Sequence, residues 1–267
     1  MSSAIVALIH WNNQPVDPVF LTAANRCVQY RCPDGAWQWA AGPVGMAQAD
    51  LATLPEDDPG VPVSSERFRI VADCRLDNRD EIFRTLPSEF KPRQNSDAAF
   101  ILAAYAAWGG ACVDHLLGDF AFVIWDIQQQ TLFAARDTAG ARPLYYFEAS
   151  DRLILVSELT QAFQNGAVPL EINEEHIVEY LTPQFQGAMG WELGWFKGFQ
   201  VLPVGHTLQA QTGHIQVRSY WDWRDYPLEE CSEKDAIEEY RSLLTEAVAC
   251  RLRSRHAVAF ELSGGLD

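Results

Sequence analysis

Positive charge is scarce in this sequence of 267 residues. It carries 20 lysines and arginines against 36 aspartates and glutamates, which gives a formal net charge of −16. Proteins bind the phosphate backbone of nucleic acids through a basic face, so this balance argues against a nucleic-acid partner. It argues equally against an anionic membrane surface, which attracts lysine and arginine.

Long apolar runs are also lacking. No stretch approaches the roughly 20 apolar residues of a membrane-spanning helix, and the amino terminus has no basic region like that of a signal peptide. The six cysteines form no CxxC pair, and the six histidines show no metal-ligand spacing. The sequence therefore predicts a cytoplasmic protein with reduced thiols, no membrane partner and no metal site.

Material for a core is ample. Hydrophobic residues make up 48% of the chain, and its length suits one large domain, or one domain with part of another. Two sets of apolar residues alternate along 120–125, which predicts a strand with one face in a thick core. Polar residues follow at 126–130, and a second apolar run at 131–135 completes a predicted hairpin.

Three charged residues lie beside these apolar strands, namely Asp119, Arg136 and Asp137. An ionised group in such surroundings must be paired or hydrogen-bonded. We expect these three residues to close the strand ends by pairing with one another.

Helices are expected around the strands. The apolar stretch 98–108 predicts a buried helix behind a Ser96-Asp97 cap, residues 174–181 predict a second helix, and Ser232 begins a long third one. The apolar-rich run at 257–262 is typical of a buried parallel strand. Strands outnumber helices up to residue 160, so the pattern favours an α+β layered sandwich.

The central stretch resembles a known family. Its residues are similar to the GxFAF … RDxxGxxPLYY signature of the amino-terminal, class II glutamine amidotransferase-like domain of asparagine synthetases: Gly118-Asp119-Phe120-Ala121-Phe122, Arg136-Asp137, Gly140 and Pro143-Leu144-Tyr145-Tyr146. The resemblance implies the four-layer αββα fold of amino-terminal-nucleophile hydrolases over residues 1–185. It further implies a linker and interdomain segment at 186–230, the truncated start of an α/β ATP-binding domain at 231–267, and a possible homodimer.

The nucleophile of that family is missing. Members with an active glutaminase begin Met-Cys-Gly-Ile and use the cysteine thiol, whereas no cysteine precedes Cys27 here. Alignment places Ser3 at the nucleophile position, but removal of the first methionine would leave the free amine on Ser2. A slip of one residue turns a side chain to the opposite face of a strand. A serine nucleophile is chemically possible, yet neither serine combines the right face with the free amine, so we assign no catalytic residue.

The rest of the glutamine site is degenerate by the same comparison. Residues 32–66 contain no lysine or arginine, although the resemblance implies an arginine there for the α-carboxylate of glutamine. Asp73, Cys74 and Arg75 replace the family's Asn-Gly-Glu, whose first two residues supply oxyanion donors. An ionised Asp73 would repel an oxyanion, and Cys74 lacks the backbone freedom of glycine. Asp97 either matches the family aspartate that holds the glutamine amine or is simply a helix cap.

The last residues resemble part of a pyrophosphate loop. Ser263, Gly264, Gly265, Leu266 and Asp267 are similar to the Ser-Gly-Gly-Leu-Asp-Ser segment of the synthetase half, in which backbone N–H groups approach phosphate. The final serine and the following helix are absent from the sequence. We therefore expect a frayed terminus here, with ATP and Mg as cofactors only of a full-length ligase and none for this chain.

Three functions remain open. The first is the amino-terminal part of an ATP-dependent amide ligase that has lost its glutaminase and uses a tethered amine, as lasso-peptide macrolactam cyclases and β-lactam synthetases do. Residues 71–81 and 102–109 resemble the lasso cyclases most, so a precursor peptide or the missing synthetase domain is the expected partner. The second is a non-catalytic scaffold, with the aromatic segment 185–199 as an interdomain staple or a peptide-binding surface. The third is a glutamine-hydrolysing asparagine synthase with an unusual nucleophile.

Overall fold

The predicted hairpin lies at the centre of the molecule. The computed structural model describes residues 3–182, 194–228 and 230–259. In it, β5 (Gly118–Asp126) and β6 (Thr131–Arg136) pair antiparallel, with Asp126 opposite Thr131, which confirms the hairpin. The alternation along β5 was expected to bury one face, but both faces are buried. Phe120, Phe122 and Ile124 face a helical layer, and the intervening Ala121, Val123 and Trp125 face a second sheet.

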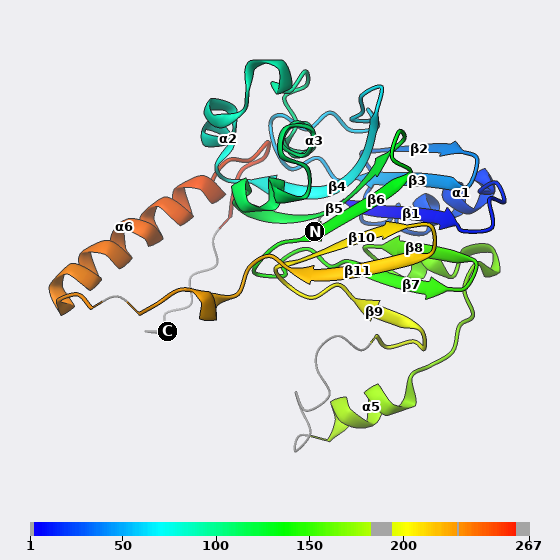
Figure 1. Cartoon of the computed structure of the whole chain (residues 1–267). Coiled ribbons are helices and arrows are strands. Elements are labelled where there is room, and N and C mark those ends of the chain that lie inside the picture. The colour runs from blue at the N-terminus through cyan, green and yellow to red at the C-terminus, as the bar shows by residue number, and fades with distance from the viewer. Residues whose placement is uncertain (1–2, 183–193, 229, 260–267) are drawn as a thin grey trace.

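Two antiparallel sheets stack on each other (Figure 1). The first contains, in spatial order, β2 (Gly35–Ala41), β3 (Val44–Asp50), β1 (Ala4–His10), β8 (Arg152–Val156), β7 (Tyr145–Ala149) and β9 (Phe199–Val201). The second contains β11 (His214–Ser219), β10 (His206–Gln211), β6, β5 and β4 (Phe68–Leu76).

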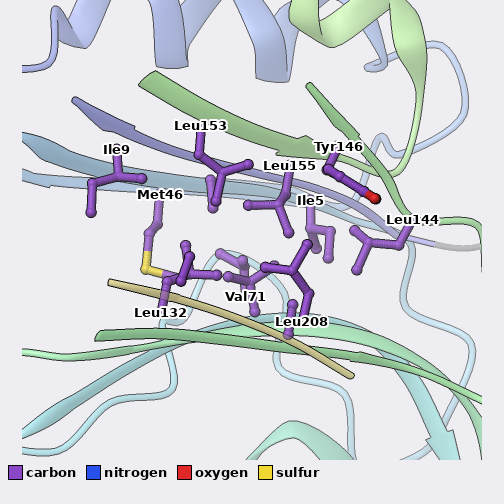
Figure 2. Close-up of a cluster of buried hydrophobic side chains, with 14 of the residues drawn as sticks. Ile5, Ile9, Met46, Val71, Leu132, Leu144, Tyr146, Leu153, Leu155 and Leu208 are labelled. Carbon is purple, nitrogen blue, oxygen red and sulfur yellow. The ribbon is translucent and has the colours of Figure 1, made fainter. Parts of the chain in front are cut away.

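Branched aliphatic side chains from both sheets fill the space between them. Ile5 and Ile9 of β1 and Leu153 and Leu155 of β8 point toward the second sheet, as Figure 2 shows. Leu208 of β10 meets them from the opposite side. Each of these side chains is at most 4% exposed, and burying one of them fully contributes about 1.5–3 kcal/mol.

Helices cover the outer face of each sheet. The four helices of these two layers are α1 (Pro18–Cys27) and α4 (Leu159–Ala162) on the first sheet, and α2 (Arg79–Thr85) and α3 (Asp97–Trp108) on the second. Helix α1 begins where the carboxylate of Asp17 accepts a hydrogen bond from the Val19 amide, with Pro18 in its first turn. These layers give the expected αββα order.

Two further helices extend beyond the sandwich. Helix α5 (Glu174–Leu181) matches the predicted span, and α6 (Glu233–Arg251) begins at Ser232, whose hydroxyl accepts from the Asp235 amide as expected of a cap. Figure 1 shows α6 reaching away from the sheets, with its carboxyl end near α2. A strand was expected at 257–262. Residues 257–259 do not form a strand, and the rest of that range lies outside the described residues.

The segment assigned above to a linker, 186–230, contributes to both sheets. Its residues 199–219 include β9, which pairs with β7, and β10, which pairs with β6. Short 3-10 helices occupy Ser88–Phe90, Gly109–His115, Gln164–Gly166 and Trp223–Asp225. Within the described ranges, no helix is both long enough and apolar enough to cross a membrane.

Candidate functional site

A small cavity opens where β1 begins. Ser3 immediately precedes this strand, and its Oγ accepts a hydrogen bond from the Leu51 amide at 3.2 Å. The cavity has a volume of about 70 Å³, and its lining includes Ser3, Asp73, Cys74 and Asp97. The structure thus brings together four of the residues singled out in the sequence. Arg75 is not part of this lining, and Ser2 lies outside the described residues.

The hydroxyl of Ser3 has little help toward nucleophilic attack. A serine becomes a nucleophile when a nearby base takes its proton. Neither histidine nor lysine occurs in the described lining of the cavity, and the bond from Leu51 makes the Ser3 oxygen an acceptor. The groups in the lining that could accept a proton are carboxylates. Of these, Asp73 faces Arg142 and Asp97 is paired with Arg253.

Neighbouring thiols do not replace the missing cysteine. Burial raises the pKa of Cys32 to about 11, and the nearby carboxylates of Asp73 and Asp50 act in the same direction. Burial also raises the pKa of Cys74 well above its ordinary value, with Asp97 and Asp73 adding to the effect. Both thiols are therefore poorer nucleophiles at neutral pH than an exposed cysteine, because the thiolate is the reactive form.

Asp73 faces an arginine that the sequence analysis missed. The Nε atom of Arg142 lies 3.7 Å from Oδ1 of Asp73, and both side chains line the cavity. The Asp73 carboxylate is buried, where a charge needs a partner, and Arg142 supplies one. A negative group therefore stands at the place expected to hold an oxyanion donor.

The loop that carries Arg142 is organised by Asp137. This fully buried carboxylate accepts hydrogen bonds from the amides of Phe120, Ala139, Ala141 and Arg142 at 2.9–3.2 Å. Such a set of amides around one carboxylate fixes the turn between β6 and β7. The sequence signal for Arg142 was its place in this turn, immediately before Pro143.

The expected pairing among Asp119, Arg136 and Asp137 is wrong. Asp119 instead forms an ion pair with Arg251. The Arg136 guanidinium donates to the backbone carbonyls of Arg142, Leu202 and Gly140 at 2.8–3.0 Å, so it bonds to dipoles and not to a carboxylate. Carbonyl oxygens satisfy a buried guanidinium where their dipoles converge on it.

Asp97 is more than a helix cap. Its Oδ2 accepts from the Leu76 amide at 2.8 Å and lies 2.9 Å from Nη2 of Arg253, while Oδ1 lies 3.0 Å from Nη1 of Arg79. The Ser96 hydroxyl, which was expected to cap α3, makes no capping bond. Asp97 therefore links α3 to β4 and to the segment after α6.

Arg75 contacts that same segment from the other side. Its Nη1 donates to the carbonyl of Arg253 at 2.9 Å, its Nη2 donates to the carbonyl of Cys250, and its Nε lies 3.3 Å from Asp77. These bonds direct the guanidinium away from the cavity. Arg75, which the sequence analysis placed in a degenerate glutamine site, is thus a structural anchor.

The stretch without lysine or arginine, 32–66, supplies polar groups of another kind. Gln48 on β3 donates from Nε2 to Asp50 at 2.6 Å and accepts from the Ala72 amide at 2.9 Å, so it bridges the two sheets beside the cavity. The only arginine in the described lining of the cavity, Arg142, comes from the turn between β6 and β7.

Some of the remaining predicted residues form contacts, and others lie outside the described residues. Trp195 of the aromatic segment packs edge-on against His176 and Tyr180 of α5, with ring centroids 4.8 and 5.1 Å apart, and Phe196 meets Phe163. The described part of that segment therefore packs within the domain. Ser263 to Asp267 lie outside the described residues. Among the described residues, no three or more His, Cys, Asp or Glu side chains are arranged to hold a metal ion.

Comparison with known families identifies the class to which this architecture belongs. Residues 2–221 match the family model described as glutamine amidotransferase domain, and the chain belongs to this family. The match agrees with the resemblance found along β5 and β6. It also ends beyond β11, in accord with the place of residues 199–219 in the sheets.

Curated relatives include amidases and asparagine synthetases. The chain is 31% identical to amidase chry2 of Gibberella zeae over 253 residues, covering 90% of this chain and 36% of the relative. It is 27% identical to asparagine synthetase [glutamine-hydrolyzing] 3 of Bacillus subtilis, covering 89% of this chain and 39% of the relative. The chain thus spans less than two fifths of the length of either relative.

Solved structures support the fold. The glutamine phosphoribosylpyrophosphate amidotransferase of Bacillus subtilis, complexed with ADP and GMP, superposes with a TM-score of 0.58 at 14% identity. The likeness covers 82% of this chain and 49% of that chain. The predicted α+β fold of the amidotransferase type is confirmed, while the start of a nucleotide-binding domain at 231–267 stays a prediction.

Proposed function

We propose that this chain is the amidotransferase-like part of an ATP-dependent amide ligase and that it has lost glutaminase activity. The observation that carries the proposal is the cavity at Ser3. The described lining offers the Ser3 hydroxyl no imidazole or amine base. It also contains the Asp73–Arg142 ion pair where oxyanion donors are expected. Hydrolysis of an amide needs an activated nucleophile and donors for the developing oxyanion.

Recognition of free glutamine is also unsupported by the charges around the cavity. An amino acid brings one ammonium and one carboxylate, and each needs an opposite charge that is available for it. The carboxylate of Asp97 already lies within 3.0 Å of nitrogen atoms on Arg79 and Arg253. The guanidinium of Arg142 faces Asp73, with its Nε 3.7 Å from Oδ1.

The ligase half of the proposal follows from the relatives. Asparagine synthetases are among them, and a ligase of this type would activate a carboxylate with ATP and Mg before an amine attacks it. Ser263, Gly264 and Gly265 would then belong to the loop that approaches the pyrophosphate. The narrower hypothesis of a lasso-peptide cyclase, with a precursor peptide as partner, rests on the sequence resemblance alone.

A non-catalytic scaffold is the second candidate. The observation that favours it is the surface of α6, on which Ile237, Tyr240, Leu243, Leu244 and Val248 are 46–68% exposed. An amphipathic helix with an uncovered apolar side is typical of an interface. In a ligase that side would contact the synthetase domain, and in a scaffold it would contact a separate protein.

The deciding experiment is release of glutamate from L-glutamine by the purified chain. We expect no release above the blank, and the same result for Ser3→Ala. A second variant that lacks Ser2 and carries Ser3→Cys places a thiol next to a free amine, and we expect it to stay inactive because Asp73 is unchanged. Glutamate release by the unaltered chain that Ser3→Ala abolishes would instead favour a glutamine-hydrolysing asparagine synthase.

A further inference from the structure

Strand β2 forms an open border of the first sheet, with α1 beside it (Figure 1). It pairs with β3 and with no other strand of the described sheets. The indoles of Trp37 and Trp39 pack against the core between the sheets. The side chains on the opposite face of the strand, toward α1, belong to Ala36, Gln38 and Ala40, and all three residues are exposed.

The backbone of β2 has unused hydrogen-bonding groups at this border. The His10 amide donates to the Pro43 carbonyl, so odd-numbered residues along β3 turn their backbone groups toward β1. Even-numbered residues such as Gln48 therefore bond to β2, where Trp37 lies opposite. Because backbone groups alternate along a strand, three residues of β2 direct their N–H and C=O groups to the open side: Ala36, Gln38 and Ala40.

The other border strands carry features that discourage the addition of a further strand. Edge strands are usually protected by charged residues, by proline or by being very short. Strand β9 has only three residues, β11 carries Arg218, and β4 carries Arg69 and Asp73. Strand β2 has seven residues and neither a charge nor a proline. Among the described borders it is therefore the one best suited to pair with another strand.

A groove of about 440 Å³ lies between α1 and β2. Two contacts hold its walls together. The Asn25 side chain donates from Nδ2 to the Trp37 carbonyl at 3.0 Å, and the Thr22 hydroxyl donates to Oε1 of Gln38 at 3.1 Å. A preformed groove loses less conformational entropy when it binds a ligand. The groove shares no described lining residue with the Ser3 cavity, so the two sites are separate.

Arg26 gives this groove its charge. It is the only charged residue in the described lining, it is exposed, and it forms no ion pair with another described residue. A guanidinium binds a carboxylate through two parallel hydrogen bonds, so Arg26 favours an acidic partner. A second copy of the chain fits less well. It would bring its own Arg26 to the same border and a net charge of −16 to an equally charged molecule.

We propose that β2 and α1 form a docking site for an extended peptide segment, which adds to the first sheet as a further antiparallel strand. Directly opposed side chains of paired strands lie on the same face, so the peptide residue opposite Gln38 points into the groove. There Arg26 binds a carboxylate at that position. The two neighbouring peptide residues point toward Trp37 and Trp39 and are apolar. The proposal goes beyond the function proposed above and does not rest on it.

The test adds the capped peptide Ser-Val-Thr-Val-Glu-Val-Thr-Val-Ser to the full chain and follows the NMR signal of the Gln38 amide. We expect saturable binding that slows hydrogen exchange at this amide. Methylation of the backbone nitrogens of the glutamate and threonines should abolish binding, because these amides face β2. Methylation of the valine nitrogens should leave it, because these amides face away. Absence of binding by the unmodified peptide, or equal binding by the two methylated peptides, overturns strand addition.

Arg26→Ala tests the charge of the groove. It should weaken binding of the peptide by about fivefold, the upper range for an exposed ion pair, and should not affect a peptide with glutamine in place of glutamate. An equal loss for both peptides overturns the carboxylate contact. Arg218→Ala on β11 is the matched control, since this arginine is also exposed on a border strand, and it should bind like the unaltered chain.

Gln38→Pro tests the border itself. It removes an N–H that faces the open side, so the protein should fold and lose the peptide. If Gln38→Pro does not fold, the methylated peptides decide on the unaltered chain. Sedimentation distinguishes the remaining occupant. A dimer of the unaltered chain that Gln38→Pro or the peptide dissociates would assign the border to a second copy and overturn the proposal, and we expect a sedimentation coefficient that the peptide and Gln38→Pro leave unchanged.

Discussion

Replacement of Asp137 by alanine should destabilise the protein more than almost any other loss of a single polar side chain. The carboxylate is 0% exposed and accepts hydrogen bonds from four backbone amides, one on β5 and three in the turn that leads to β7. Truncation to Asp137→Ala removes the acceptor and leaves those amides without it.

The magnitude follows from the number and kind of these bonds. A hydrogen bond to a charged group contributes about 1.5–3 kcal/mol to stability. Four such bonds would give an upper bound. The actual loss should be smaller, because Ala139 and Ala141 are exposed and water can replace the carboxylate at their amides. We expect Asp137→Ala to lower the free energy of unfolding by about 3–5 kcal/mol. Asp137→Asn keeps one acceptor oxygen and should fall between the two proteins.

Urea unfolding followed by tryptophan fluorescence measures the effect, since the chain has nine tryptophans. Asp222→Ala is the matched control: this carboxylate also accepts a backbone amide and pairs with an arginine, but it lies at the surface, and its loss should change stability little. A decrease of less than about 1 kcal/mol in the unfolding free energy of Asp137→Ala would refute the claim that this carboxylate organises the turn between β6 and β7.

Three further outcomes test other parts of the structure. Phe122→Ala should lower the unfolding free energy by about 3–5 kcal/mol in urea, because a fully buried ring is removed. Cys32 should react with iodoacetamide far more slowly than exposed Cys231 at neutral pH, and its raised pKa should cost stability as pH climbs from about 9 to about 11. Tyr220→Phe should cost about 1 kcal/mol in the same unfolding assay, since its hydroxyl donates to the Arg136 carbonyl.

The sequence predicted local elements well because their signals are local. The period of two along β5 and the polar break before β6 identify a hairpin without any knowledge of its neighbours. The same alternation misled on burial. Both residue sets along β5 are apolar, which is what a strand between two layers needs, and the prediction of a single buried face ignored the second set.

The charged residues were harder to predict because their partners are distant in sequence. Asp97 and Arg253 are 156 positions apart, and Asp119 and Arg251 are 132 apart. No periodicity or short motif links such pairs. The expectation that neighbouring charges neutralise one another failed at Arg136, since a buried guanidinium is satisfied equally by carbonyl oxygens that a turn brings together.

The cavity at Ser3 shows why the substitutions there act together. Asp73 lies in β4, Ser3 precedes β1, and Arg142 comes from a turn, so only the folded sheets unite them. A site that binds a charged substrate keeps opposite charges available for it, and these unpaired charges destabilise the folded protein. Here Asp97 is paired with Arg253 and Asp73 faces Arg142, and a volume of about 70 Å³ holds only a few water molecules. Changing Ser3 alone leaves this internal neutralisation in place, because the groups that would receive a substrate's charges are bound to each other.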